Sequence, residues 1–150
     1  MATILIADDD ADIRQLVIYS LADEGHEVAV AKDGREVVDQ FAAAAPDLLI
    51  LDIMMPEMDG FDVLRALEEQ ETRGDAKILV LTAKGSEHDW KLGYDLGADR
   101  YMTKPFDPEE LIVTANELLS ASQEELDARR EQEQDRANLL SQLESIFGDS

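Results

Sequence analysis

The sequence predicts an α/β domain built on a doubly wound, parallel five-stranded sheet. Two observations lead to this fold class. Short apolar runs alternate five times with segments in which apolar residues recur every three or four positions. The runs are apolar throughout, which is typical of parallel strands covered by helices on both faces. A chain of 150 residues is long enough for one such domain.

Five apolar runs are the expected strands, and each is followed by a helical segment. The strands should cover residues 4–7, 28–31, 48–51, 78–81 and 100–103. The helices should cover about residues 13–21, 37–45, 61–67 and 87–96, with a last helix from Pro108, a residue type favoured in the first helical turn. The crossovers between parallel strands should be right-handed.

The last helix is expected to extend beyond the domain, since residues 109–147 contain neither Gly nor Pro. We therefore divide the chain into a domain at 1–121 and a helical extension at 122–150. Counting alternately three and four residues forward from residue 112 to 147 gives eleven positions that would form one stripe along a helix. Seven of these positions are apolar, but Arg129, Glu133 and Arg136 interrupt the stripe. Two arrangements remain open: a homodimeric coiled coil through residues 112–147, or a tail that packs back on its own domain or frays.

The composition excludes several classes of function. The 35 acidic residues outnumber the 13 basic ones, and a net charge of −22 disfavours direct binding to nucleic acid or to anionic membranes. The absence of cysteine excludes thiol catalysis and thiolate metal sites. No apolar run approaches the ~20 residues of a membrane span, and the first residues lack a secretory pattern, so a cytoplasmic protein is expected.

Polar side chains follow four of the five predicted strands. Asp8 and Asp9 follow the first strand, Asp52 the third, Thr82 the fourth and Lys104 the fifth. In open parallel sheets, ligands bind beyond the carboxyl ends of the strands. If the strands are neighbours in space, these side chains meet in one crevice. Clustered carboxylates without His or Cys favour a hard cation, and Mg²⁺ is the expected one.

This set of residues suits phosphoryl transfer to a carboxylate. Asp52 could attack phosphorus and form an aspartyl phosphate, while the metal ion and Lys104 offset the charge and Thr82 donates to a phosphoryl oxygen. Phosphatases of this chemistry often place an acid/base Asp two positions after the nucleophile. Met54 occupies that position here and cannot transfer a proton, which favours a switch over a hydrolase.

The motifs resemble those of response-regulator receiver domains over about residues 2–121. They are the segments 4–10, 51–60, 81–83, 97–99 and 104–106, in the family's order and spacing. The resemblance implies a flavodoxin-like (βα)5 fold with strand order 2-1-3-4-5 and a cis Lys104–Pro105 bond.

The resemblance also implies a role for each site residue. Asp52 is then the phosphoacceptor, and the Mg²⁺ ligands are Asp8, Asp9, Asp52 and the backbone carbonyl of Met54. Thr82 and Lys104 hold the phosphoryl group, and Thr82 and Tyr101 form the switch. The donor is a histidine kinase or phosphotransfer protein, and phosphorylation changes contacts with an output protein. The receiver is not an enzyme toward other substrates; it catalyses its own phosphotransfer and slow autodephosphorylation.

Other interpretations remain beside this one. Asp10 and Asp12 are best explained as helix-capping and first-turn residues. The chain could be a coiled-coil adaptor or scaffold in which the receiver only docks, although an adaptor has no need of the complete acidic site. It could also be the receiver and signalling helix of a longer regulator. The sequence identifies neither the cognate kinase nor the output partner.

Overall fold

The computed structural model describes residues 2–83 and 90–147 and contains one five-stranded sheet. Its strands are β1 (Thr3–Ala7), β2 (Glu27–Ala31), β3 (Leu48–Asp52), β4 (Lys77–Ala83) and β5 (Arg100–Lys104). The strands pair in parallel in the order β2-β1-β3-β4-β5, which confirms the predicted fold. The sheet is fully parallel because the helix between two successive strands carries the chain back to the end of the sheet where the strands begin.

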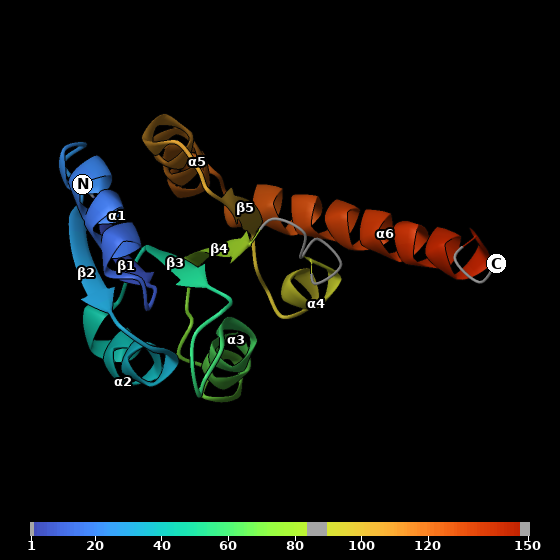
Figure 1. Ribbon diagram of the computed structural model, residues 1–150, viewed down its shortest axis with the longest axis horizontal. Coiled ribbons are helices and arrows are strands. Elements are labelled where there is room, and N and C mark those ends of the chain that lie inside the picture. Colours follow the sequence, from blue (N-terminus) through green and yellow to red (C-terminus); the bar gives the residue numbers. More distant parts are fainter. Residues whose placement is uncertain (1, 84–89, 148–150) are drawn as a thin grey trace.

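Helices cover both faces of the sheet (Figure 1). They are α1 (Ala11–Ala22), α2 (Gly34–Ala44), α3 (Gly60–Glu69), α4 (Trp90–Asp95), α5 (Pro108–Ser120) and α6 (Gln123–Phe147). The predicted fourth helix began at residue 87, but residues 87–89 lie outside the described part of the chain. One apolar core lies between the sheet and α2 and α3, and a second lies between the sheet and α1 and α5. Strands with both faces buried explain why the five runs are apolar throughout.

Aspartates begin three of the helices. Asp10 accepts a hydrogen bond from the Asp12 amide at 2.8 Å and caps α1. Asp33 accepts one from the Glu36 amide at 2.9 Å and caps α2. Asp59 and Asp62 form a reciprocal capping box at the start of α3. Part of the acidic excess is therefore structural, as expected for Asp10 and Asp12.

The C-terminal region differs from the predicted single extended helix. Helix α5 ends at Ser120, Ala121 has an extended backbone with φ −73° and ψ 143°, and α6 begins at Gln123. The Ser122 hydroxyl accepts a hydrogen bond from the Glu125 amide at 3.1 Å, which caps the new helix. This break redirects the chain, and α6 then runs beside α4 and projects past it (Figure 1).

The break also removes the continuous seam that a coiled coil through residues 112–147 would need. Leu126 is fully buried, and Ile112 and Leu119 pack against the same core of this domain. The large apolar side chains of α6 that are exposed among the described residues lie in its final turns, at Leu139, Leu140, Leu143, Ile146 and Phe147. The first half of α6 thus packs on its own domain, whereas homodimerisation through the exposed last turns stays a prediction. No helix in the described ranges has the length and apolar character to cross a membrane.

Candidate functional site

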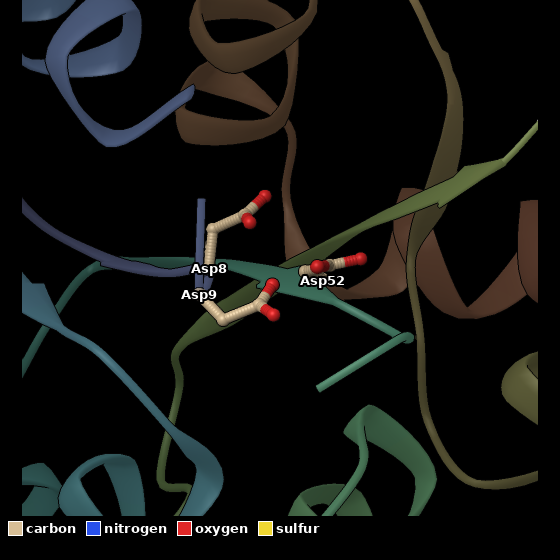
Figure 2. A group of neighbouring side chains, drawn as sticks. All are labelled: Asp8, Asp9 and Asp52. Carbon is tan, nitrogen blue, oxygen red and sulfur yellow. The ribbon is translucent and has the colours of Figure 1, made fainter. Parts of the chain in front are cut away.

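Three carboxylates meet at the carboxyl ends of two neighbouring strands. Asp8 and Asp9 directly follow β1, and Asp52 is the last residue of β3. One carboxylate oxygen from each lies within 4.8 Å of the others. Figure 2 shows the three side chains gathered at this edge. Asp8 and Asp52 are buried while Asp9 is exposed, so the cluster opens to solvent on one side.

Backbone contacts hold Asp52 and Asp8 in place. The Met54 amide donates to Asp52 Oδ1 at 3.1 Å, and the Asp10 amide donates to Asp8 Oδ1 at 2.9 Å. The chain after β3 also folds tightly against Gly60, since a Cβ there would lie 2.8 Å from the Asp52 carbonyl oxygen. Only glycine permits this approach, so Gly60 fixes the backbone of the loop that carries Met54.

Lys104 brings a positive charge to the cluster from the end of β5. Its Nζ lies 2.8 Å from Asp8 Oδ2 and 3.3 Å from Asp52 Oδ2. The Lys104–Pro105 peptide bond is cis, as expected from the resemblance. Burial alone would lower the pKa of Lys104, but the contact with Asp8 and the charges of Asp52 and Asp8 raise it overall, which keeps the ammonium protonated.

The carboxylates exceed the positive charge available to them. Within the described ranges, Lys104 is the one cation in ion-pair contact with this cluster, and it contacts Asp8 and Asp52. Burial and the neighbouring Asp8 charge raise the pKa of Asp52 from 3.8 to about 7, although Lys104 and the Met54 amide act in the opposite direction. Two like charges in a buried site disfavour full ionisation unless a further cation is present.

The donor set fits a hard divalent cation. Asp8 Oδ2 is buried, and the Lys104 ammonium that lies 2.8 Å from it also serves Asp52. One cation shared by two buried carboxylates leaves negative charge uncompensated, and a metal ion would supply the missing charge. Carboxylate oxygens without imidazole or thiolate are ligands suited to Mg²⁺. The structure therefore brings together an acidic cluster that could bind a metal ion.

The remaining predicted residues lie on β4, on β5 and in the loop after β3. Thr82 is buried near the end of β4, in register with Thr103, while Asp52 pairs with Leu81. Tyr101 lies on β5 and packs its ring against Trp90 and Tyr94 of α4, with centroids 5.7 and 5.1 Å away. Met54 is 68% exposed, and its contact with the cluster is made by its backbone amide, which donates to Asp52.

Comparison with known proteins identifies this arrangement. The model of the response regulator receiver domain matches residues 4–116. The chain belongs to the response-regulator receiver family. Receivers of this family act in two-component signalling and are activated by phosphorylation.

Individual relatives agree with the family assignment. The receiver is 42% identical over 120 residues to the alkaline phosphatase synthesis transcriptional regulatory protein PhoP of Bacillus subtilis, covering 80% of this chain and 49% of PhoP. It is 44% identical over 125 residues to the response regulator MprA of Mycobacterium avium, covering 83% and 54%. The chain thus spans about half the length of these curated relatives.

Solved structures show the same fold. Vibrio cholerae chemotaxis response regulator CheY4 superposes with a TM-score of 0.74 at 38% identity, covering 79% of this chain and 98% of CheY4. The BeF3-activated DrrB receiver domain gives a TM-score of 0.71 at 28% identity, covering 81% and 99%. These matches support the receiver fold over most of the chain.

Sequence reasoning missed a second buried carboxylate, at the other end of the sheet. Asp99 accepts hydrogen bonds from the Ile78 amide and the Arg73 guanidinium, both at 2.8 Å, and is also paired with Arg130 of α6. The receiver-like segment 97–99 pointed to Asp99, but nothing in the local pattern pointed to arginines 26 residues before and 31 residues after it.

Proposed function

We propose that the receiver catalyses transfer of a phosphoryl group from a donor to Asp52, with Mg²⁺ bound by Asp8, Asp9, Asp52 and the Met54 carbonyl. The observation that carries this proposal is the charge deficit around two buried carboxylates, Asp8 and Asp52. A bound cation would supply the missing charge and would lower the repulsion between Asp52 and an incoming phosphoryl group. Residues 1–121 form the receiver in this proposal, and residues 122–150 form a helical extension.

The reaction itself needs only positioning and charge. An Asp52 carboxylate oxygen attacks phosphorus, the bond to the donor's leaving group breaks, and the leaving group departs with the electron pair. Lys104 stabilises the charge on the phosphoryl oxygens, and the Thr82 hydroxyl turns toward one of them. Histidine phosphate in a kinase or phosphotransfer protein is the expected donor. Other molecules are not substrates, so the receiver turns over only its own phosphoryl group.

The predicted persistence of the phosphorylated state follows from Met54. A thioether at this position cannot activate water, and in the proposed site the carboxylates of Asp8 and Asp9 are engaged as metal ligands. The Asp52 phosphate should therefore decay slowly without a phosphatase.

A phosphorylation assay tests the site. The purified protein is incubated with a small phosphodonor such as acetyl phosphate, with and without Mg²⁺, and phosphorylated protein is quantified by intact mass. Phosphorylation should require Mg²⁺ and should be lost in Asp52→Asn, since an amide does not attack phosphorus. Asp39→Asn, an exposed position on α2, is the matched control and should be phosphorylated normally. Undiminished phosphorylation of Asp52→Asn would remove Asp52 from this role.

A further inference from the structure

Helix α6 covers a face of its own receiver through specific polar contacts. Arg130 donates to the carbonyl oxygen of Ala98 at 3.2 Å and forms an ion pair with Asp99, whose side chain has no exposed surface. One turn later, Gln134 donates to the carbonyl oxygen of Tyr94 at 3.2 Å. Leu126 at the start of α6 is fully buried. These contacts place α6 against α4 and the start of β5.

Arg130 of α6 and Arg73 of the receiver core bind different oxygens of Asp99. The Ile78 amide and Arg73 both donate to Asp99 Oδ2, and Arg73 also donates to the carbonyl oxygens of Ala76 and Gly97. Arg130 donates to Asp99 Oδ1. The receiver core therefore supplies one arginine to this carboxylate and α6 supplies the second, so the contact joins a separate helix to this end of the sheet, which is the role of a docking contact.

The surface under α6 is connected to the acidic site through Tyr101. Its ring lies between Trp90 and Tyr94, and its hydroxyl oxygen lies 1.5 Å from the place where a Cβ of Gly93 would be. Glycine on α4 thus provides the space that Tyr101 occupies. Tyr94, which contacts Tyr101 from this side, is the residue whose carbonyl oxygen accepts from Gln134 of α6.

Thr82 links Tyr101 to Asp52. Val80 pairs with Tyr101 and Thr82 pairs with Thr103, and alternate residues of a strand share a face, so Thr82 and Tyr101 lie on the same face of the sheet. A Thr82 hydroxyl drawn toward a phosphoryl group on Asp52 would leave space on the side of Tyr101. Movement of Tyr101 into that space would change the packing of α4, on which α6 rests.

We infer that α4 and the start of β5 form a helix-docking surface whose resident ligand is α6, and that phosphorylation of Asp52 lowers the affinity of this surface for α6. The docking stands on the contacts of Arg130 and Gln134, whereas the release rests on the proposed function of Asp52. A partner that replaces α6 has to present the same chemistry, an amphipathic helix with an arginine directed at Asp99.

Coupling between the two sites is reciprocal. If a phosphoryl group weakens α6 docking, then weakening α6 docking must favour the phosphorylated conformation by the same factor. Arg130→Gln should therefore bind beryllofluoride, a stand-in for the phosphoryl group, about fivefold more tightly than the wild type in the presence of Mg²⁺. Arg129→Gln is the matched control, since Arg129 is exposed at the preceding position of α6.

Spin-label distances test the inference directly. The chain has no native cysteine, so labels can be placed at Asp39→Cys on α2 and Gln142→Cys on α6, both exposed. The unphosphorylated protein should give one narrow distance distribution. Mg²⁺ with beryllofluoride should broaden and shift it, and Arg130→Gln should do the same without beryllofluoride while Arg129→Gln does not.

The outcomes separate the inference from the proposed function. Occupancy of Asp52 is read independently from a bound fluorine resonance that requires Mg²⁺ and is lost in Asp52→Asn. An unchanged distribution in a protein with bound beryllofluoride would overturn the release. An unchanged distribution in Arg130→Gln would overturn the docking role of Arg130. Failure of beryllofluoride to bind would instead contradict the proposed function and the release that rests on it, leaving the docking to stand on the Arg130→Gln result.

Discussion

Two sites that contain buried carboxylates lie at opposite ends of the same sheet. Negative charge is in excess at one site and positive charge at the other. At the carboxyl ends of the strands, Asp8 and Asp52 share Lys104 as their one ion-pair partner among the described residues, and Asp9 lies beside them. At the amino ends, Asp99 alone contacts two cations, Arg73 and Arg130, and a backbone amide. The first cluster lacks positive charge and is suited to receive an ion and a phosphoryl group. The second is fully compensated and holds structure together.

Burial of a carboxylate therefore does not by itself indicate a functional site. Both Asp52 and Asp99 have almost no exposed surface. What distinguishes them is whether the surrounding residues satisfy the charge. Unpaired buried charge destabilises a fold, so its retention points to a function that depends on it.

The largest expected effect on stability is at Asp99. Asp99→Asn removes the charge that pairs with two partly buried guanidinium groups, and it should lower the free energy of unfolding by about 3–5 kcal/mol. Urea unfolding followed by circular dichroism would measure this. A loss below about 1 kcal/mol would contradict the structural role of this cluster.

The next largest effect is on the rate of phosphorylation at the acidic cluster. Lys104→Met removes the fixed cation and should slow phosphorylation of Asp52 by about 100-fold, because preorganised charge in a buried site contributes strongly to phosphoryl transfer. Lys32→Met, at an exposed position after β2, is the control and should leave the rate unchanged. Equal rates in the wild type and Lys104→Met at saturating Mg²⁺ would exclude Lys104 from the reaction.

A smaller effect on the free energy of unfolding, opposite in sign to that of Asp99→Asn, is expected from Asp52→Asn. The folded-state pKa of Asp52 is raised to about 7 from 3.8, so the folded state binds the proton more tightly than the unfolded state. Stability of the metal-free protein should therefore fall as the pH rises from about 4 to about 7, by about 2–4 kcal/mol. Asp52→Asn should remove this dependence and stabilise the protein at pH 8.

The proposed Mg²⁺ site should show the opposite dependence on pH. Mg²⁺ would bind the ionised carboxylate of Asp52, so its affinity should rise with pH and level off above about 7. Below that pH, each unit should weaken Mg²⁺ binding by about tenfold, and Asp9→Ala should weaken it at all pH values. Calorimetric titration across this range measures both effects. A pH-independent Mg²⁺ affinity would show that Asp52 is not a ligand.

Much of the fold and of the acidic site could be predicted from the sequence. Strands buried on both faces leave uninterrupted apolar runs, and residues that directly follow such runs must lie at one edge of a parallel sheet. The positions of Asp8, Asp52 and Lys104 follow from this rule once the strands are neighbours. The strand order itself came from the family resemblance, because apolar patterns do not encode which buried strands pair.

The C-terminal region could be predicted less well. The helix break at Ala121 contains neither Gly nor Pro, but the spacing of Ser122 and Glu125 is a capping signature that was available in the sequence. Leu126 was assigned to an intermolecular seam, whereas it completes the core of its own domain. The pairing of Arg130 with Asp99 depends on the angle between α5 and α6, which no local pattern specifies.

The position of the phosphoryl group is the most direct test of the account. The protein is phosphorylated with acetyl phosphate and Mg²⁺, then reduced with borohydride, which converts an aspartyl phosphate to homoserine, and its peptides are mapped by mass spectrometry. Homoserine should appear at Asp52 and at no other aspartate. Homoserine at Asp8 or Asp9, or a phosphoryl group retained on a histidine, would contradict the account.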